Sequence, residues 1–347
     1  MRSIGTITRL GLACLFAFIM LARGAAAQEP LRWKFEKGEK LDYKMVQDMT
    51  MTAEGGPLKK METKMRQEMD MTWDIEDVNA EGHAVIRQKF DRVKMKMTTP
   101  VGGFEYDSDS DEAPAGLAAM IAPMYKAMTE GEFIITMSDR GEVKDVKIPE
   151  EVLTALKNSP GAAAMGDLST AEGFKKMISQ GALVLPEAQP KEGETWSTKV
   201  EMNNPMVGTQ TVQTTYRYEG DKEMDGTTYS VIRPELKMDF ANNAQPNLQM
   251  KIGEQSSDGE VLFNVDEGRL HTSTLNQNLT LDITVGGQPM KQKIDQKINV
   301  TVTRAGEAES DQPSAESEEA KVESEEAKVE SEEAKVESAE AKSESEK

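Results

Sequence analysis

The sequence of 347 residues contains one cysteine, two histidines and 5% aromatic residues. The chain therefore has few residues from which to build a catalytic cysteine, a zinc site of cysteine and histidine, or an imidazole general base. The patterns GxSxG, HExxH and GxxxxGK[ST], which mark a serine nucleophile, a zinc protease and a phosphate loop, are absent from the sequence. We therefore expect a protein that is not an enzyme and has no cofactor.

Positive charge is also scarce. The chain has 41 Lys+Arg against 61 Asp+Glu, a formal net charge of -20. No basic stripe interleaved with aromatic residues occurs, and the acidic balance repels phosphate. Nucleic acid is therefore excluded as an expected partner.

Long hydrophobic runs are missing except at the N-terminus. Arg2 and Arg9 precede an apolar run from Leu10 to Ala22, and the small residues 25–27 follow. This is the pattern of an export signal over residues 1–27, and the run is shorter than the roughly 20 residues of a membrane span. We expect an exported protein, periplasmic or extracellular, with no transmembrane anchor after cleavage. Because Cys14 would leave with the signal, the mature chain has no disulfide.

The C-terminal segment, residues 305–347, is acidic and repetitive. It repeats SEEAKVE three times from Ser317 and holds 16 Asp+Glu against 5 Lys. Such low-complexity sequence cannot bury enough apolar surface to fold, so it predicts a disordered tail. An interaction of the tail with an envelope partner is the alternative role.

The core, residues 28–304, opens with strand patterns. Residues 61–76 alternate, with mainly apolar side chains at odd positions and charged or polar ones at even positions. This period of two predicts a half-buried strand. Residues 41–52 and 83–97 are similar, the latter with a predicted bulge near Asp91 that restores its parity. An antiparallel meander is expected.

A helical period follows. Apolar residues from Leu117 to Met128 recur at helical spacing, with Pro114 suited to a helix start, and residues 150–157 predict a second helix. A capping-box pattern from Ser169 predicts a third. Strands return after Gly193, and we predict them over residues 196–202, 209–218, 229–233, 248–252, 260–265, 270–281 and 292–302.

The two strand regions resemble each other. Residues 37–45 match residues 192–200, 72–76 match 215–219, and 131–143 match 259–270, in the same order. We therefore predict an α+β fold, with a mainly antiparallel twisted sheet in two similar halves. The halves cover about residues 31–150 and 190–304, with a helical insertion over about 113–180 and the disordered acidic tail.

Several of these motifs carry a family resemblance. They are Gly38-Glu39, Gly131-Glu132 leading to Gly141, Leu185-Pro186 before residues 193–196, and the segment 259–270. Together they resemble an exported bacterial family of unknown function over about residues 31–304. The resemblance implies an envelope protein and implies no activity.

Methionine is the unusual residue, with 23 copies. The spacing MxxxMxM occurs twice, which places thioethers on one face of a strand. An adaptable methionine surface favours an apolar or lipid-like ligand, for which the candidate residues are Met45, Met49, Met65, Met69 and Trp73. The alternatives are a Cu(I) site at Met69 and Met71, an envelope scaffold that uses the acidic tail, and simple core packing.

Overall fold

The computed structural model describes residues 29–55, 58–159, 166–204, 208–241 and 248–306. The predicted signal segment, residues 1–27, lies outside the described residues, and so does the acidic tail beyond Gly306. The described residues up to Arg304 belong to one compact unit.

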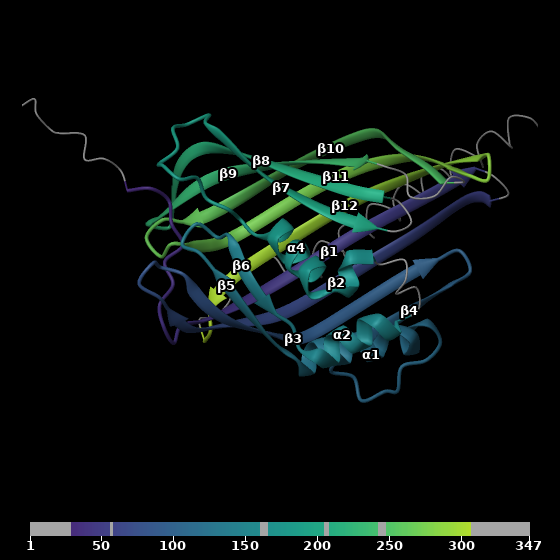
Figure 1. Cartoon of the computed structure of the whole chain (residues 1–347), viewed down its shortest axis with the longest axis horizontal. Coiled ribbons are helices and arrows are strands. Elements are labelled where there is room, and N and C mark those ends of the chain that lie inside the picture. Colours follow the sequence, from purple (N-terminus) through teal and green to yellow (C-terminus); the bar gives the residue numbers. More distant parts are fainter. Residues whose placement is uncertain (1–28, 56–57, 160–165, 205–207, 242–247, 307–347) are drawn as a thin grey trace, which may run out of the picture. The chain divides into compact units, whose positions relative to one another are not determined.

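Twelve strands within the described residues form one antiparallel sheet (Figure 1). The strand order is β6-β5-β3-β2-β1-β12-β11-β10-β9-β8-β7, and β4 pairs with β3 off this path. The strands are β1 (Lys40–Gly55), β2 (Leu58–Val78), β3 (Ala84–Thr99), β4 (Gly102–Asp107), β5 (Glu132–Met137), β6 (Val143–Lys147), β7 (Thr195–Asn204), β8 (Gly208–Met224), β9 (Thr227–Ala241), β10 (Leu248–Asn264), β11 (Arg269–Val285) and β12 (Gln288–Arg304). The predicted antiparallel sheet is confirmed.

The bulge predicted near Asp91 is present. Asp70 on β2 pairs with Arg92 on β3, whereas the next residue, Met71, pairs with Phe90. Asp91 is therefore the extra residue of β3, and apolar side chains before and after it reach the same face of the sheet.

Several strands are longer than the pattern indicated: β9 was predicted over residues 229–233 and spans Thr227–Ala241, and β10 joins two predicted strands. Residues 248–252 and 260–265 were predicted as separate strands, whereas β10 runs without a break from Leu248 to Asn264. The separation was wrong because the polar stretch between them still pairs with β11, after a bulge between Ile252 and Gln255. Side-chain periodicity is lost there, but backbone pairing is kept.

Three α-helices and a short 3-10 helix lie between the two strand regions. They are α1 (Leu117–Glu130), α2 (Glu150–Asn158), η1 (Gly166–Ser169) and α4 (Ala171–Gly181). The helix start at Pro114 was wrong, since α1 begins at Leu117. The cap of α4 is Thr170, whose hydroxyl accepts the N–H of Gly173 at 3.0 Å. The capping pattern was thus displaced by one residue.

The predicted helical range also contains two strands. Between α1 and α2, strand β5 pairs with β3 and β6 pairs with β5, at one edge of the sheet. Phe133, Ile135 and Met137 alternate with more exposed residues along β5. This short period of two is the reason for strand structure within the mainly helical stretch.

The sheet has two similar halves. Strands β1, β2, β3, β5 and β6 run in order toward one edge, and β7 to β11 run in order in the same direction across the sheet, with β12 joining β1 to β11. The register is shifted after Ile75 in the first half and after Tyr218 in the second. These two residues occupy the same place in the matched segments 72–76 and 215–219.

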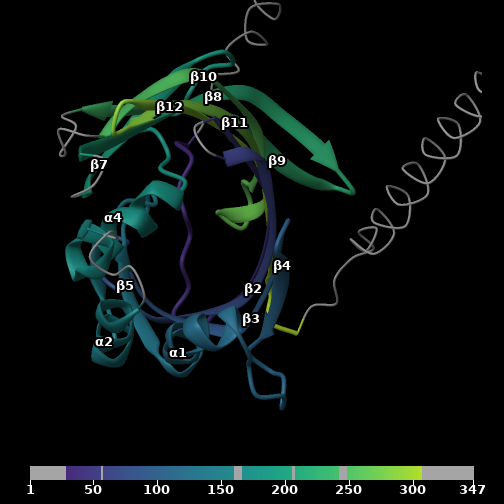
Figure 2. The ribbon, with the colours of Figure 1, turned by 90° about the vertical axis from the view of Figure 1, so that its right-hand side faces the viewer.

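The N-terminal segment, residues 31–35, joins the two halves at one end of the sheet. The N–H of Trp33 donates to the carbonyl of Asp139 at 2.7 Å, and the N–H of Lys34 donates to the carbonyl of Gly268 at 2.8 Å. Figure 2 shows the sheet bent around this purple segment, with the helices on the remaining side. The segment therefore ties the β5–β6 turn to the β10–β11 turn.

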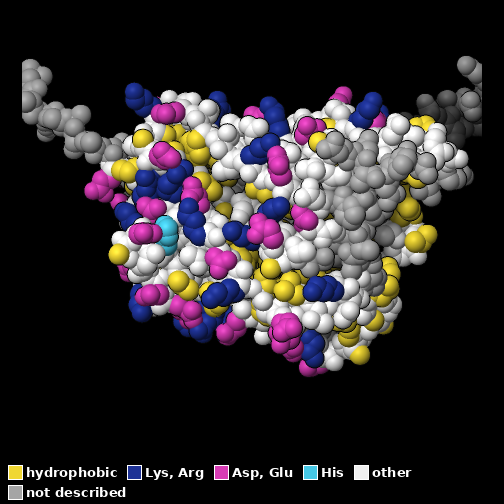
Figure 3. All heavy atoms as spheres, viewed as in Figure 1, with side chains coloured by type: hydrophobic (Ala, Val, Ile, Leu, Met, Phe, Trp, Pro, Cys, Tyr) yellow, Lys and Arg dark blue, Asp and Glu magenta, His cyan; other side chains and the backbone are white. Residues whose placement is uncertain are grey.

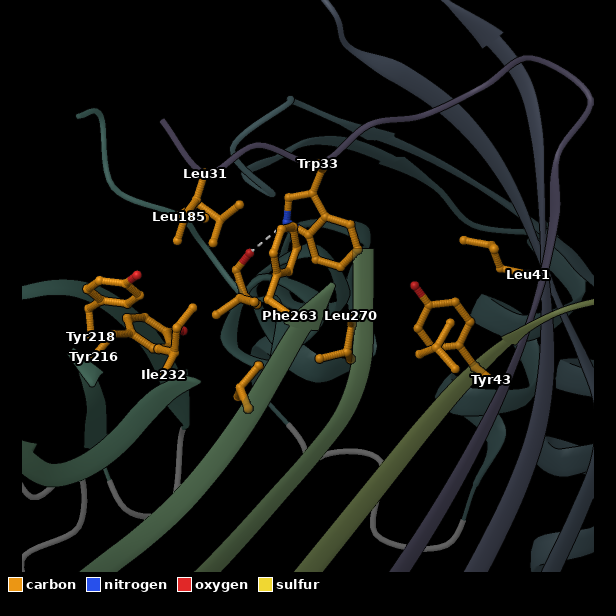
Figure 4. Close-up of a cluster of buried hydrophobic side chains, with 13 residues drawn as sticks. Leu31, Trp33, Leu41, Tyr43, Leu185, Tyr216, Tyr218, Ile232, Phe263 and Leu270 are labelled. Atoms are coloured by element: carbon orange, nitrogen blue, oxygen red, sulfur yellow. Dashed lines mark hydrogen bonds between the residues drawn. The ribbon is translucent and has the colours of Figure 1, made fainter. Parts of the chain in front are cut away.

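A buried apolar cluster surrounds that segment (Figure 4). The Trp33 indole donates to the carbonyl of Leu183 at 3.2 Å and lies edge-on to Phe263, with ring centroids 5.5 Å apart. Leu41 and Val302 supply the cluster from the central strands. Helix α4 packs against both edge strands, β6 and β7, so helices bridge the two edges of the sheet.

Candidate functional site

The concave face of the sheet, on which the helices and the N-terminal segment pack, is the candidate site, and we call it the inner face. On β1 and β2 it takes the odd-numbered residues 41–53 and 61–75, and on β12 and β11 the even-numbered residues 290–302 and the odd-numbered residues 273–285. None of these side chains is charged. Because 29% of the residues in the chain are charged, the lack of charge on these strand positions shows that charged side chains are kept off the inner face.

Charges gather on the opposite face. Arg66 of β2 contacts Asp48 of β1 at 3.1 Å and Glu68 at 3.0 Å, and Arg92 of β3 forms a double contact with Asp107 of β4. The outer side of the sheet is therefore suited to water. The helix-covered side, which is the face seen in Figure 3, also carries Lys and Arg beside Asp and Glu.

The middle of the inner face is only half-buried. Leu41 and Val302 are buried at one end, and Leu279 and Leu281 are buried toward the other. Between these ends lies what we call the central inner face, whose members are all half-buried: Met45, Gln47, Met49, Met65, Gln67, Leu275, Gln277, Gln296 and Ile298.

The five predicted ligand residues come together on this side. Met45 pairs with Met69 and Met49 pairs with Met65 across β1 and β2, and Trp73 lies further along β2, opposite Leu41. The sheet thus places all five on the inner face, three of them in its central part. Their binding of a ligand stays a prediction.

Met69 and Trp73 have packing roles as well. Met69 contacts the buried cluster under the helices, and Trp73 contacts both that cluster and the one around Trp33. The Trp73 indole donates to the side-chain oxygen of Gln88 at 3.0 Å, and its ring centroid lies 4.3 Å from that of Tyr43. These two candidates therefore form a wall next to the central inner face.

Sequence reasoning missed the half of the site that comes from the end of the chain. Leu275 and Gln277 of β11 and Gln296 and Ile298 of β12 complete the central inner face. The alternation in residues 290–302 was a usable signal for the face of β12. Its pairing with β1, whose residues are 235 to 263 positions away in the sequence (Gly55↔Met290 and Leu41↔Arg304), had no local signal.

One tyrosine reaches this face from the helices. Tyr125 of α1 accepts a hydrogen bond from the side-chain nitrogen of Gln67 at 3.3 Å, and its own hydroxyl donates to the sulfur of Met95 at 3.9 Å. Its ring stacks on Tyr106, with centroids 5.4 Å apart. Burial raises the pKa of Tyr125 to about 12, so the hydroxyl is a neutral hydrogen-bonding group at physiological pH.

Acidic, histidine and cysteine ligands do not gather in the described part of the chain, where no group of three or more could hold a metal ion. His83 lies 3.7 Å from Glu81, and His271 packs on Tyr229 with ring centroids 4.9 Å apart. Burial lowers the pKa of His271. Neither imidazole points to metal chemistry.

The predicted Cu(I) residues, Met69 and Met71, both lie on the inner face of β2. Met71 pairs with Tyr43 and Phe90 and packs against two buried clusters. A row of three methionines occurs elsewhere, where Met65 lies between Met49 and Met97. Cu(I) binding at Met69 and Met71 stays a prediction, and the row of Met49, Met65 and Met97 serves below as a comparison.

A second concavity lies away from the sheet. It is a groove of about 740 Å³ between α1 and α2, lined by Met120, Pro123, Lys126, Ala127, Glu130, Gly131, Glu150, Glu151, Thr154, Ala155, Asn158 and Ser159. Its acidic rim separates it chemically from the uncharged inner face. In the described part of the chain, every helix is too short or too polar to cross a membrane.

Comparisons with known proteins place the chain without assigning an activity. A family model described as a family of unknown function (DUF6263) matches residues 81–258, more than half of the chain. No curated protein matches.

Solved structures show only a distant likeness. A lipovitellin structure, titled for lipid-protein interactions, has a TM-score of 0.42 and 12% identity over 80% of this chain, which spans 26% of that chain. DynF from the dynemicin pathway of Micromonospora chersina has a TM-score of 0.20 and 7% identity, covering 80% of this chain and 86% of that one. An outer membrane channel from Pseudomonas putida F1 has a TM-score of 0.23 and 7% identity, covering 78% of this chain and 97% of that one.

Proposed function

Because the chain belongs to this family of unknown function (DUF6263), its role has to be inferred from its geometry, and we propose that it is an exported, non-enzymatic carrier of a lipid-like molecule. The ligand we infer has a long alkyl chain, which lies along the strands on the central inner face. The N-terminal signal pattern supports the export part of the proposal.

One observation carries the binding part: the central inner face is uncharged, five of its nine residues are apolar, and all nine are only half-buried. Met45, Met49, Met65, Leu275 and Ile298 are not among the described side chains that pack against the three buried clusters. Apolar surface that remains accessible on a concave face gains free energy when an apolar ligand displaces water from it. Scattered exposed apolar residues would carry no such inference, but a continuous lining does.

Methionine suits this role. Its unbranched side chain has three rotatable bonds, so a methionine surface adapts to flexible ligands. Four methionines, Met45, Met49, Met65 and Met69, form two directly opposed pairs on β1 and β2. The stretch from Met45 to Met51 extends about 20 Å along the strand, a length that suits an extended alkyl chain better than a compact metabolite.

The experiment is native mass spectrometry of the exported chain, residues 28–347, purified from a bacterial host that secretes it. The same sample is measured after denaturation, and lipid extracts are compared. A non-covalent adduct of lipid mass that is absent from the denatured chain is expected. If the chain is bare and remains bare after incubation with monopalmitoylglycerol, the carrier proposal is wrong.

A further inference from the structure

Polar side chains interrupt the apolar lining at two adjacent positions along the strands of the central inner face. They are four glutamines: Gln67 of β2, Gln47 of β1, Gln296 of β12 and Gln277 of β11. We propose that this glutamine set recognises an uncharged, hydrogen-bonding group of the bound molecule, such as an ester or amide carbonyl. The inference rests on the proposed carrier function and names the class of its ligand.

The register brings the four side chains together. Gln47 lies directly opposite Gln67, and Gln296 lies directly opposite Gln277. The two pairs are joined across β1 and β12, where Met49 faces Gln296 and Gln47 faces Ile298. Gln47 and Gln296 are therefore diagonal neighbours, about 7–8 Å apart at Cα, which is within reach of one ligand group between them.

These amides are not used by the protein itself. Within the described residues, the side chains of Gln47, Gln277 and Gln296 make no hydrogen bond to another protein group. Each is half-buried, which places donors and acceptors on a face that is otherwise apolar. A ligand that displaces water from these amides has to replace the hydrogen bonds of that water, so a ligand with a polar group at this position is favoured.

Gln67 is the one member that is held in place. Its side-chain nitrogen donates to the Tyr125 hydroxyl at 3.3 Å and to the sulfur of Met69 at 3.7 Å. These contacts direct its amide nitrogen toward α1 and leave its carbonyl oxygen available. Tyr125 is therefore a positioning residue for the glutamine set.

The chemistry of the set selects the ligand. A glutamine amide both donates and accepts hydrogen bonds, so it can pair with a carbonyl or with a hydroxyl. A carboxylate or ammonium group would be desolvated here with no opposite charge on the inner face, which is strongly unfavourable. The ligand group beside the glutamines is therefore neutral, and apolar side chains for the alkyl chain lie on either side of Gln47 along β1, at Met45 and at Met49.

The test separates polar recognition from apolar binding by using two probes on the exported chain. Diphenylhexatriene, a hydrocarbon whose fluorescence rises in apolar surroundings, reports on the lining alone. Monopalmitoylglycerol, which has an ester, and palmitate, which is a carboxylate, are then titrated in as competitors. We expect monopalmitoylglycerol to displace the probe at least about 10-fold more tightly than palmitate at pH 8.

Single variants locate the effect. Gln47→Leu and Gln277→Leu should each weaken monopalmitoylglycerol about 3- to 10-fold, the value of one neutral hydrogen bond, while diphenylhexatriene binds as well or better. Gln213→Leu on the outer, exposed side of β8 is the matched control and should change neither the affinity for monopalmitoylglycerol nor that for diphenylhexatriene. Tyr125→Phe should weaken monopalmitoylglycerol by no more than Gln67→Leu does, and the double variant should match Gln67→Leu, because Tyr125 acts only through Gln67.

The outcomes are distinguishable. If diphenylhexatriene does not bind the wild-type chain, the carrier function itself is wrong. If it binds but the ester and the carboxylate compete equally, or the glutamine variants leave ester affinity unchanged, the recognition site is wrong and the carrier stands. If Tyr125→Phe weakens both probes alike, its role is structural and not that of a positioning residue.

Discussion

Gly38 and Gly193 perform the same task in the two halves of the sheet. The N–H of Gly38 donates to the carbonyl of Ile75 at 2.8 Å, and the N–H of Gly193 donates to the carbonyl of Tyr218 at 2.7 Å. Both glycines have positive φ, 86° and 82°, in the turn that leads into the first strand of each half. The similarity noticed in the sequence is thus a similarity of backbone geometry.

This relationship predicts equal costs for equal substitutions. Neither glycine has an atom within 4 Å of the position a Cβ would take, so Gly38→Ala and Gly193→Ala meet only the backbone penalty, about 1–2 kcal/mol each. At Gly141, φ is also 86°, but a Cβ would lie 2.6 Å from the Trp33 indole nitrogen and against the Leu183 carbonyl. Gly141→Ala should cost about 3 kcal/mol or more. Urea unfolding of the three variants measures these free energies. Equal losses of unfolding free energy at all three sites would contradict the packing described around Trp33.

A buried ion pair should matter more than an exposed one. Arg269 contacts Glu39 at 3.0 Å, with side-chain exposures of 8% and 10%, whereas Lys37 contacts Asp77 at 3.1 Å with exposures of 70% and 60%. Arg269→Met removes one of two cations that contact the buried Glu39, whose other partner is Arg304 at 2.9 Å, so the variant should destabilise the fold by about 1–3 kcal/mol. Lys37→Met should change the free energy of unfolding by less than about 1 kcal/mol. Urea unfolding measures both variants. Similar losses of unfolding free energy would count against this description of the two ion pairs.

Two aspartates should respond to pH with opposite signs. Hydrogen bonds from Arg92 lower the pKa of Asp107, so its stabilising effect is present above its unfolded pKa of about 3.9 and is lost as pH falls through the folded value. Burial raises the pKa of Asp70, so its charged form opposes folding near neutral pH. Asp107→Asn should therefore destabilise and Asp70→Asn should stabilise at pH 7, and both differences should shrink toward pH 3. Thermal unfolding between pH 3 and pH 7 measures these stability differences. Changes of the same sign in the two variants would contradict the prediction.

The sequence supported the fold better than the site. Alternation over residues 61–76 located β2 and its inner face, and the parity change near Asp91 located a real bulge, because both are local consequences of burial. The helix start at Pro114 and the break in β10 failed because caps and polar strand segments depend on neighbouring backbone. Periodicity of side chains does not report on those contacts.

For the site, the methionines of β1 and β2 were found because they are close in sequence and share a parity. The residues of β11 and β12 were not, since their place beside β1 depends on pairing between distant parts of the chain. The glutamines were missed for another reason. A glutamine at an inner position looks like ordinary polar alternation until the register shows four of them together.

The methionine candidates for Cu(I) give a further prediction. Met69 and Met71 pack against buried clusters, so Met69→Leu with Met71→Leu should fold and lose less than about 1.5 kcal/mol per site. The metal hypothesis requires that this double variant abolish Cu(I) binding. Met49→Leu with Met97→Leu is the control for the alternative row. Competition titration with a Cu(I) chelator tests both pairs, and a wild-type chain that takes no Cu(I) from the chelator removes the metal hypothesis.

The most direct measurement of the central claim is a diphenylhexatriene titration of three variants at two neighbouring positions of β1. Met49 faces the central inner face, and Thr50, the next residue, faces outward between Lys64 and Asp295. Met49→Lys places a charge in the lining, and Met49→Trp fills it without charge, which guards against an effect of misfolding. The account predicts saturable binding by wild type and Thr50→Lys, at least 10-fold weaker binding by both Met49 variants, and unchanged circular dichroism. Equal affinity in all four proteins would show that the probe does not bind on the inner face.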